Sequence, residues 1–485
     1  MTVRARTGRR RRSASGPRVG LFGLLGSGNI GNDVSMEAIL RYLRADHPNA
    51  IIDAMCVSPE RLRGYEIETV PLFWYQRYDQ RVSGMPATAL KILGKGIDAF
   101  RTATWVRRHD VVIVPGMGVL EATLPLRVWL TPYEMFLLCT SGRLFGTKVA
   151  FVSVGANLIN QRLIRWLFDT AARLAYYRSY RDAASRDAMQ QRGLDTSRDF
   201  VYPDLAFSIP TPPCDAGDPD MVGVGVMAYY GSNDNRDRAD EIHASYVENL
   251  KLFTRWLVDN GRRVRLLIGD ASDNKVVQEI LADVREYRPD LDSTWVAAAP
   301  ASSFAELTQA IAPLGTVIAT RFHNVICALR LAKPTIALGY AKKTVAIMTD
   351  AGLPEFVQSA DSLDVRLLTE QFNELNRRSA ELRRTIAERN ELNARLLEEQ
   401  FRRLSVVLFP GEPLPGGDGH QEPVAVAGQF AVSPDNPELA RPRSYGLPDA
   451  VAMDCPSLSL PKRRQSLQST LPVAQAKCVA ARESR

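Results

Sequence analysis

Short apolar runs alternate with amphipathic stretches along most of the chain. In its first half, the pattern predicts strands at 18–23, 50–57, 110–116 and 148–155, with helices at 33–46 and 132–145. The runs at 110–116 and 148–155 are short and continuously apolar, like strands that are buried on both faces of a parallel sheet. Strands that alternate with helices in this way are typical of an α/β fold.

The same alternation restarts after a proline-rich segment. We interpret residues 210–220, which include Pro210, Pro212 and Pro213, as an interdomain linker. The second half then predicts strands at 221–229, 263–269, 317–319 and 334–338, and helices at 241–259, 274–287, 304–311 and 325–332. We therefore expect two Rossmann-like, doubly wound domains, residues 18–209 and 221–360, which face each other across a cleft.

The pattern changes after Asp361. Apolar residues recur at helical spacing within 361–410, at Leu368, Phe372, Leu375, Leu382, Ile386, Leu396, Phe401 and Leu404. This predicts one long amphipathic helix or a pair broken near Ser379 or Arg389. We expect the segment to pack on the two domains rather than form a coiled coil. Residues 411–485 have little periodicity, which predicts a disordered tail.

Composition and charge narrow the class of protein. The six cysteines are scattered singly, which argues against a disulfide scaffold and a structural zinc site and favours the reduced cytoplasm. No stretch approaches the roughly 20 apolar residues that span a bilayer. The net charge of +7 equals the seven arginines among residues 1–18, so the basic character belongs to a leader, residues 1–17, and Arg18. That leader is disordered, contacts an anionic membrane surface at the inner face, or binds nucleic acid; we expect no nucleic-acid partner.

The most informative segment is 317–343, where basic and polar side chains follow strand ends. Its candidate ligand-binding residues are Arg321, His323, Asn324, Tyr340, Lys342 and Lys343. In open α/β sheets, ligands bind outside the carboxyl ends of strands, where helix N-termini favour anions. The alternative is structural: His323 is a helix N-cap or a core histidine, and Arg321 pairs with a buried acid.

Three further strand exits carry candidate residues. The glycine-rich turn at 23–33 offers Asn29, Gly31 and Asn32, and later exits offer Gly116, Gly118, Arg181 and Asp182. The turn fits a dinucleotide fingerprint at Gly26, Gly28 and Gly31, for which Asp53 is the candidate ribose acid, but a tight structural turn has the same pattern. For Arg181 and Asp182, the alternative is a surface ion pair in which Asp182 caps a helix.

Taken together and in order, these motifs resemble the polysaccharide pyruvyl transferase family. They comprise the G-N-x-G turn, the exit at 116–120, the Ser-Val-Gly-Ala step at 153–156, the Ser179-x-Arg181-Asp182-x-x-Ser185 segment with Pro203-Asp204, and Arg321-x-His323 with Ala328-Leu329 and Pro334. The resemblance covers about residues 18–350. The chain departs from the family pattern at Asn32-Asp33, where the family usually has Asp-Glu, and at Met117, which interrupts a run of glycines.

The resemblance implies a fold similar to two-domain GT-B glycosyltransferases. It also implies transfer of the carboxyvinyl unit of phosphoenolpyruvate to two sugar hydroxyls, which gives a pyruvate ketal on a cell-envelope glycan or lipid-linked sugar. We expect His323 to act as general acid or base, and Arg181 and Arg321 to hold the phosphate and the carboxylate. No cofactor or metal is expected. A nucleotide-sugar glycosyltransferase and a non-catalytic envelope-assembly protein are the alternatives.

Overall fold

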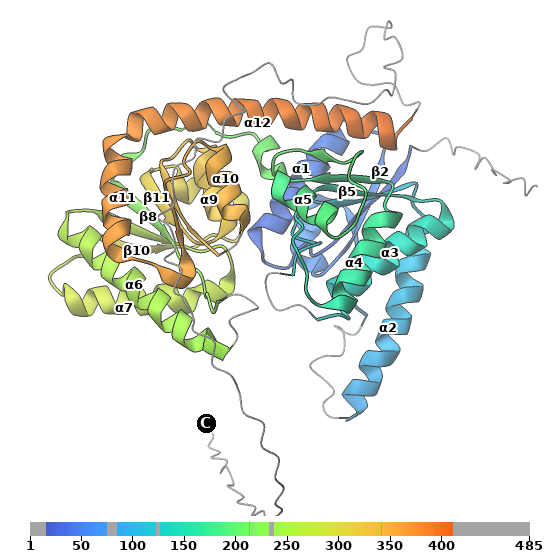
Figure 1. Cartoon of the computed structure of the whole chain (residues 1–485), viewed down its shortest axis with the longest axis horizontal. Helices are drawn as coiled ribbons and strands as arrows, with labels where there is room; N and C mark the ends of the chain where they lie inside the picture. The colour runs from blue at the N-terminus through green and yellow to red at the C-terminus, as the bar shows by residue number, and fades with distance from the viewer. Residues whose placement is uncertain are drawn as a thin grey trace, which may run out of the picture. The chain divides into compact units, whose positions relative to one another are not determined.

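The computed structural model describes residues 16–74, 85–122, 127–212, 214–231, 237–340 and 342–410. The arginine-rich stretch before residue 16 and the predicted tail from 411 onward lie outside the described residues. Within them, two parallel sheets with helices on their faces form two lobes (Figure 1). None of the described helices combines the length and the hydropathy that crossing a membrane requires.

The N-terminal lobe is built on a sheet whose seven described strands run parallel in the order β3-β2-β1-β4-β5-β6-β7. All five residues of β4 are buried, which explains their uniform apolar character. The strands are β1 (Arg18–Phe22), β2 (Ile51–Cys56), β3 (Glu68–Pro71), β4 (Val111–Pro115), β5 (Lys148–Val154), β6 (Tyr177–Tyr180) and β7 (Phe200–Val201). The strand order reverses between β1 and β4, and in open α/β sheets ligands bind outside the carboxyl ends of the strands at such a point.

Helices connect these strands in right-handed crossovers. They are α1 (Ile30–Asp46), α2 (Met85–Val106), α3 (Thr131–Phe145), α4 (Arg162–Leu174) and α5 (Ala183–Gln191). Helix α1 begins three residues before the predicted start, because the Asn29 side chain caps it by accepting a hydrogen bond from the Gly31 amide. The sequence pattern did not predict α2 and α4, whereas α5 is the helix that Asp182 was expected to cap.

The C-terminal lobe repeats the design with six described parallel strands in the order β10-β9-β8-β11-β12-β13. The strands are β8 (Asp218–Gly225), β9 (Arg263–Leu267), β10 (Val296–Ala299), β11 (Leu314–Ala319), β12 (Thr335–Gly339) and β13 (Val357–Ser359). The helices are α6 (Ala239–Asp259), α7 (Asn274–Tyr287), α8 (Phe304–Ile311), α9 (Phe322–Arg330) and α10 (Lys342–Asp350). Strand β8 begins inside the segment that was expected to be linker.

The C-terminal helical segment is the broken pair, α11 (Val365–Arg377) and α12 (Ser379–Leu408). The chain breaks at Arg378, and helix α12 continues through Arg389, so only the first of the two expected interruptions exists. Helix α12 contacts both lobes (Figure 1): the Asn390 amide donates to the Leu329 carbonyl over 2.8 Å, and the Gln400 amide donates to the Ser179 hydroxyl over 2.9 Å. The segment therefore packs on the two domains, as predicted.

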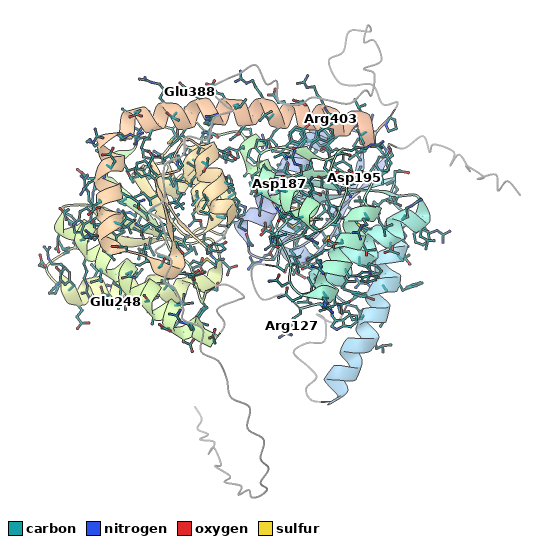
Figure 2. All side chains as sticks on the ribbon, in the orientation of Figure 1. Arg127, Asp187, Asp195, Glu248, Glu388 and Arg403 are labelled. Carbon is teal, nitrogen blue, oxygen red and sulfur yellow. The ribbon has the colours of Figure 1, made fainter. Side chains whose placement is uncertain are left out.

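The far end of α12 is fixed by its basic side chains. Arg403, marked in Figure 2, lies 4.1 Å from the Phe200 ring centroid and donates to the Tyr202 hydroxyl. Lys148 of β5 donates to the last carbonyls of α12, at Val407 and Leu408. Cations at a helix C-terminus also interact favourably with its dipole. This helix thus ties the two lobes together on one side of the crevice between them.

Candidate active site between the two lobes

A small cavity of about 90 Å³ lies where the strand exits of the two lobes meet. Residues from both lobes line it, and most of them were predicted from the sequence. The N-terminal lobe contributes Asn29, Asn32, Met117, Gly118 and Arg181, and the C-terminal lobe contributes Gly269, Arg321, Phe322, His323, Tyr340 and Lys343. The predicted residues thus form one site rather than two.

The glycine-rich turn forms one wall and is held in shape by the first turn of α1. Asn32 donates from its amide to the Leu24 carbonyl and the Ser27 hydroxyl, each over 3.2 Å. The Asp33 carboxylate accepts from the Gly26 amide over 2.7 Å. Residues 32 and 33, where the chain departs from the family pattern, therefore shape the turn itself.

The structure argues against the dinucleotide interpretation of this turn, because Asp53, its candidate ribose-binding acid, is engaged elsewhere. The Asp53 carboxylate accepts from Trp105 Nε1 over 2.9 Å and contacts His109 Nε2 at the same distance. Both partners lie in the core of the N-terminal lobe. A ribose-binding carboxylate must be available to the ligand, whereas this one is already engaged.

Arg181 stands at the exit of β6, surrounded by acids. It pairs with Glu121, and it lies 3.7 Å from Asp182 and 3.9 Å from Asp204. Burial acts to lower the pKa of Arg181, but these carboxylates more than offset it and raise the pKa. The surface ion pair is therefore wrong for Arg181, whose side chain is only 3% exposed, although Asp182 does cap α5 by accepting from the Ser185 amide.

Arg321, the residue before α9, pairs with Asp273 of the neighbouring strand exit. Its Nε and Nη2 donate to the two carboxylate oxygens over 2.9 and 2.5 Å. Asp273 is fully buried, so the structural expectation that Arg321 pairs with a buried acid is right. The bidentate contact fixes the guanidinium plane, and Arg321 still lines the cavity.

Lys343 of the C-terminal lobe forms an ion pair with Glu121 of the N-terminal lobe. Its Nζ lies 3.3 Å from the carboxylate of Glu121, which is also the partner of Arg181. Both cations also lie close to the Phe322 ring, with Arg181 Cζ and Lys343 Nζ at 5.0 and 5.1 Å from its centroid. Although burial acts to raise it, Arg181 and Lys343 lower the pKa of Glu121 to about 2.

His323 is the second residue of α9, so it is not the N-cap that the structural alternative expects. Its ring packs against Gly31 of the opposite lobe so closely that a β-carbon at position 31 would overlap it. Burial, together with the positive charges of Arg181, Lys343 and Arg321, lowers the pKa of His323 to about 3. The imidazole is therefore neutral at physiological pH while the cavity holds no anion.

The remaining predicted residues are not among those that line the cavity. Gly116 has a φ of 52° and packs against the Ser35 hydroxyl, which excludes a side chain there. Asn324 is fully buried, and neither atom of its amide has a hydrogen-bond partner among the described residues. The side chain of Lys342 lies outside the described residues; of the two lysines, Lys343 is the one shown at the cavity.

The sequence interpretation missed the acids that hold the basic residues in place. Glu121 closes the 115–121 strand exit, and Asp273 follows Gly269 after β9. Both acids follow strands, as the predicted basic residues do. Their position after a strand is the sequence feature that could have identified them. The described residues contain no group of three or more His, Cys, Asp or Glu side chains that is suited to a metal ion.

The wall of the cavity therefore contains three cationic side chains, those of Arg181, Arg321 and Lys343, and the neutral imidazole of His323. Such an arrangement attracts an anion and leaves the histidine able to accept a proton. Burial is the largest cause of the lowered pKa of His323; the three cations add to it, and the Glu121 carboxylate opposes it.

Comparisons with known proteins address the fold and the family. A structure of a UDP-N-acetylglucosamine 2-epimerase, described as putative, from Listeria monocytogenes matches with a TM-score of 0.50 at 10% identity, over 80% of this chain and 97% of the other. The S. aureus MnaA–UDP co-structure matches with a TM-score of 0.50 at 10% identity, over 83% and 100%. At this identity the likeness shows the two-domain, GT-B-like fold alone.

A search of curated protein sequences finds no match. The family model described as polysaccharide pyruvyl transferase matches residues 29–342, more than half of the chain. That interval begins at the capping residue of α1 and ends at the first residue of α10, so it contains nearly all of the cavity wall. The chain belongs to the polysaccharide pyruvyl transferase family.

Proposed function

We propose that this protein transfers pyruvate from phosphoenolpyruvate to two hydroxyls of one sugar in a cell-envelope polysaccharide or glycolipid, which forms a cyclic ketal. The observation that carries the proposal is the position of His323 in the interlobe cavity, among Arg181, Arg321 and Lys343. Family membership supplies the reaction class. The cavity has cationic side chains that can bind the donor's anionic groups and a histidine that can accept a proton.

The donor carries a phosphate and a carboxylate, so it needs cationic partners in a fixed geometry. Arg321 and Lys343 line the cavity, and each is oriented by an acid, Asp273 and Glu121 respectively. Pre-oriented cations lose little entropy when an anion binds. We assign Arg321 and Lys343 to the donor's anionic groups and give Arg181, which is more deeply buried, a supporting electrostatic role.

In the first step, neutral His323 accepts the proton of the first sugar hydroxyl while that oxygen bonds to C2 of the donor. The resulting imidazolium delivers the proton to the methylene carbon, which becomes a methyl group. The bond between C2 and the phosphate oxygen then breaks. The second hydroxyl adds to C2, and its proton leaves with inorganic phosphate, so atoms and charge balance.

Binding of the donor is expected to raise the pKa of His323, so that the ring can accept a proton. In the empty cavity, burial and the nearby cations lower its pKa to about 3. A bound phosphate and carboxylate place negative charge beside the ring and offset those cations, so the pKa of His323 rises. The ring is then basic enough to take the hydroxyl proton only when the donor is present.

The proposal places the reaction in the cytoplasm, in keeping with the free thiols of all four described cysteines. Its test is incubation with phosphoenolpyruvate and an envelope glycan, followed by measurement of released phosphate. The proposed enzyme releases phosphate only when both are present. A nucleotide-sugar glycosyltransferase would instead consume a UDP-sugar and leave phosphoenolpyruvate intact, which would refute the proposal.

A further inference from the structure

The outer surface of the N-terminal lobe carries a concentration of exposed apolar side chains. They lie on α2, α3 and α4 or on the residues that lead into α3. Phe100 and Leu144 are each 74% exposed, and Trp129 is 60% exposed. We call this surface the α2–α4 face; its apolar members are Leu93, Phe100, Trp129, Leu130, Leu144, Leu163 and Trp166. Exposed apolar groups that gather in this way mark an interaction surface.

The three helices lie side by side in one layer of the N-terminal lobe (Figure 1). Lys95 of α2 donates to Glu134 of α3 over 3.2 Å. The rings of Phe136 on α3 and Trp166 on α4 lie 5.4 Å apart. Leu93 and Phe100 are seven residues apart on α2, which puts them on the same side of that helix.

The exposed charges of the face are mostly basic. The acids of the three helices are Asp98, Glu134 and Asp169, and each is at most 6% exposed. Among the described side chains of these helices and of the segments that border them, the exposed charged residues are seven arginines and one acid, Asp110, whose carboxylate accepts from the Arg18 amide. The arginines are Arg107, Arg108, Arg127, Arg143, Arg162, Arg165 and Arg173, of which Arg127 is marked in Figure 2. The face therefore combines apolar contact groups with a predominantly cationic surround.

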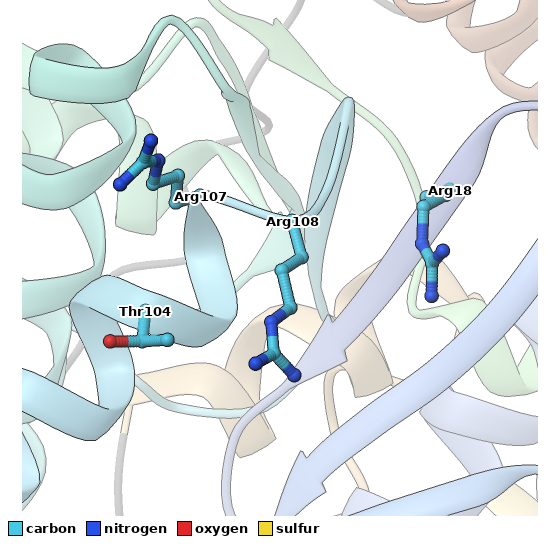
Figure 3. Close-up of a pocket in the computed structure, with 4 residues that line it drawn as sticks. All are labelled: Arg18, Thr104, Arg107 and Arg108. Carbon is cyan, nitrogen blue, oxygen red and sulfur yellow. The ribbon is translucent and has the colours of Figure 1, made fainter. Parts of the chain in front are cut away.

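At one end of α2, the face reaches a basic pocket of about 590 Å³ lined by Arg18, Thr104, Arg107 and Arg108 (Figure 3). Arg18 is the first residue of β1, so the arginine-rich leader joins the described chain at this pocket. The leader's six arginines therefore precede this pocket in the sequence.

We propose that the α2–α4 face docks on the surface of an anionic lipid bilayer. Aromatic and leucine side chains with arginines around them match the apolar boundary and the anionic headgroups of such a membrane. A second copy of the chain is a poorer occupant, because a two-fold interface would press one cationic face against another. Docking by this face would bring the proposed enzyme to lipid-linked sugars at the membrane surface.

The test is co-sedimentation of the full chain with phosphatidylglycerol vesicles and with phosphatidylcholine vesicles. Phe100→Ser with Leu144→Ser removes two highly exposed apolar groups of the face. The matched control, Leu367→Ser with Val406→Ser, removes two exposed apolar groups from α11 and α12. Arg143→Gln with Arg165→Gln removes charge from the face, and Arg366→Gln with Arg384→Gln removes it from α11 and α12.

We expect the wild-type chain to bind phosphatidylglycerol in preference to phosphatidylcholine. The apolar face variant loses about tenfold in affinity for both lipids. The charge variant loses about fivefold per arginine for phosphatidylglycerol alone. Both controls bind like wild type. Binding that is unchanged in both face variants would overturn the proposal and assign attachment to the leader, and a face variant that alters the oligomeric state instead would assign the face to a second copy.

Discussion

The imidazole ring of His323 packs directly against the backbone of Gly31, so the glycine-rich turn of one lobe and the Arg-x-His strand exit of the other meet at these two residues. The contact explains why a glycine is required there, since any β-carbon would occupy the space of the ring. It also means that the position of the proposed catalytic base depends on how the lobes meet.

Replacing Gly31 with alanine should displace His323 without unfolding the chain. Overpacking of this kind costs about 1–3 kcal/mol, and the ring is the element that can move. We expect phosphate release to fall about a hundredfold, because a displaced His323 no longer lies in position to accept the proton of the sugar hydroxyl. The control is Gly64→Ala, where a β-carbon would meet nothing within 4 Å. Equal activity of the two variants would show that the contact has no catalytic role.

His323→Gln should abolish transfer while leaving the fold intact. Glutamine keeps a polar side chain of similar reach but cannot accept and return a proton, so we expect a loss of about a hundredfold or more. The matched control is His243→Gln, which alters a histidine of α6 that contacts the Tyr229 carbonyl, away from the cavity. Retention of most activity in the His323 variant would exclude it as the proton carrier.

The pKa of His323 also predicts how stability depends on pH. In the folded state it lies near 3, below the ordinary value of 6.5, so the unfolded chain binds the proton more readily. Stability from this group is complete above about pH 6.5 and falls as the pH drops toward 3. Urea unfolding near neutral pH and at about pH 5 measures how much the free energy of unfolding falls between these conditions. We expect a smaller fall in His323→Gln than in wild type. Identical losses would contradict the assigned pKa.

Glu121→Gln tests the ion pairs that join Arg181 and Lys343. Removing the shared carboxylate leaves two cations facing each other in a largely buried setting, and we expect a loss of about 3 kcal/mol in the free energy of unfolding. Because the pKa of Glu121 is lowered to about 2, its contribution is complete above about pH 4.5 and fades as the pH falls toward 2. Glu241→Gln, in a fully exposed ion pair with Arg238, should change little.

Helix α12 should act as a clamp on the N-terminal lobe. The Gln400 amide donates to the hydroxyls of Ser153 and Ser179, and all three side chains are buried. Gln400→Ala removes the partner of the Ser153 hydroxyl, whereas the Ser179 hydroxyl still accepts from the Ser153 amide, and the change should cost about 1–3 kcal/mol in thermal unfolding experiments. Glu398→Ala, at an exposed position of the same helix, is the control. A cost no greater than that of the control would mean that α12 is only loosely attached.

Much of the fold was predictable because the buried strands are continuous apolar runs. The strands at 110–116 and 148–155 and the helices at 274–287 and 304–311 were placed to within two residues. Helix α2 was missed for a physical reason: Leu93 and Phe100 are exposed on its outer surface, so the usual contrast between a buried and a polar face is weak. Helix α4 does have a distinct apolar face, which includes Leu167, Phe168 and Ala171, so its pattern was available in the sequence.

The candidate site was predicted through its cations and glycines but not through its acids. Arg181, Arg321 and His323 stood out because basic groups at strand ends are unusual, whereas single acids such as Glu121 and Asp273 are common at such ends. Their importance depends on pairing across strand exits and lobes, which spacing along the chain does not reveal. The contact between His323 and Gly31, 292 positions apart, is of the same kind.

His323 is proposed to carry a proton in the transfer of pyruvate from phosphoenolpyruvate to a sugar. This role can be tested by mass spectrometry of an envelope glycan that has been incubated with the protein and carbon-13-labelled phosphoenolpyruvate. We expect one labelled pyruvate ketal on the glycan for each phosphate released, with neither product formed by His323→Gln. A glycan that stays unlabelled with the wild-type chain, or is labelled equally by the variant, would contradict it.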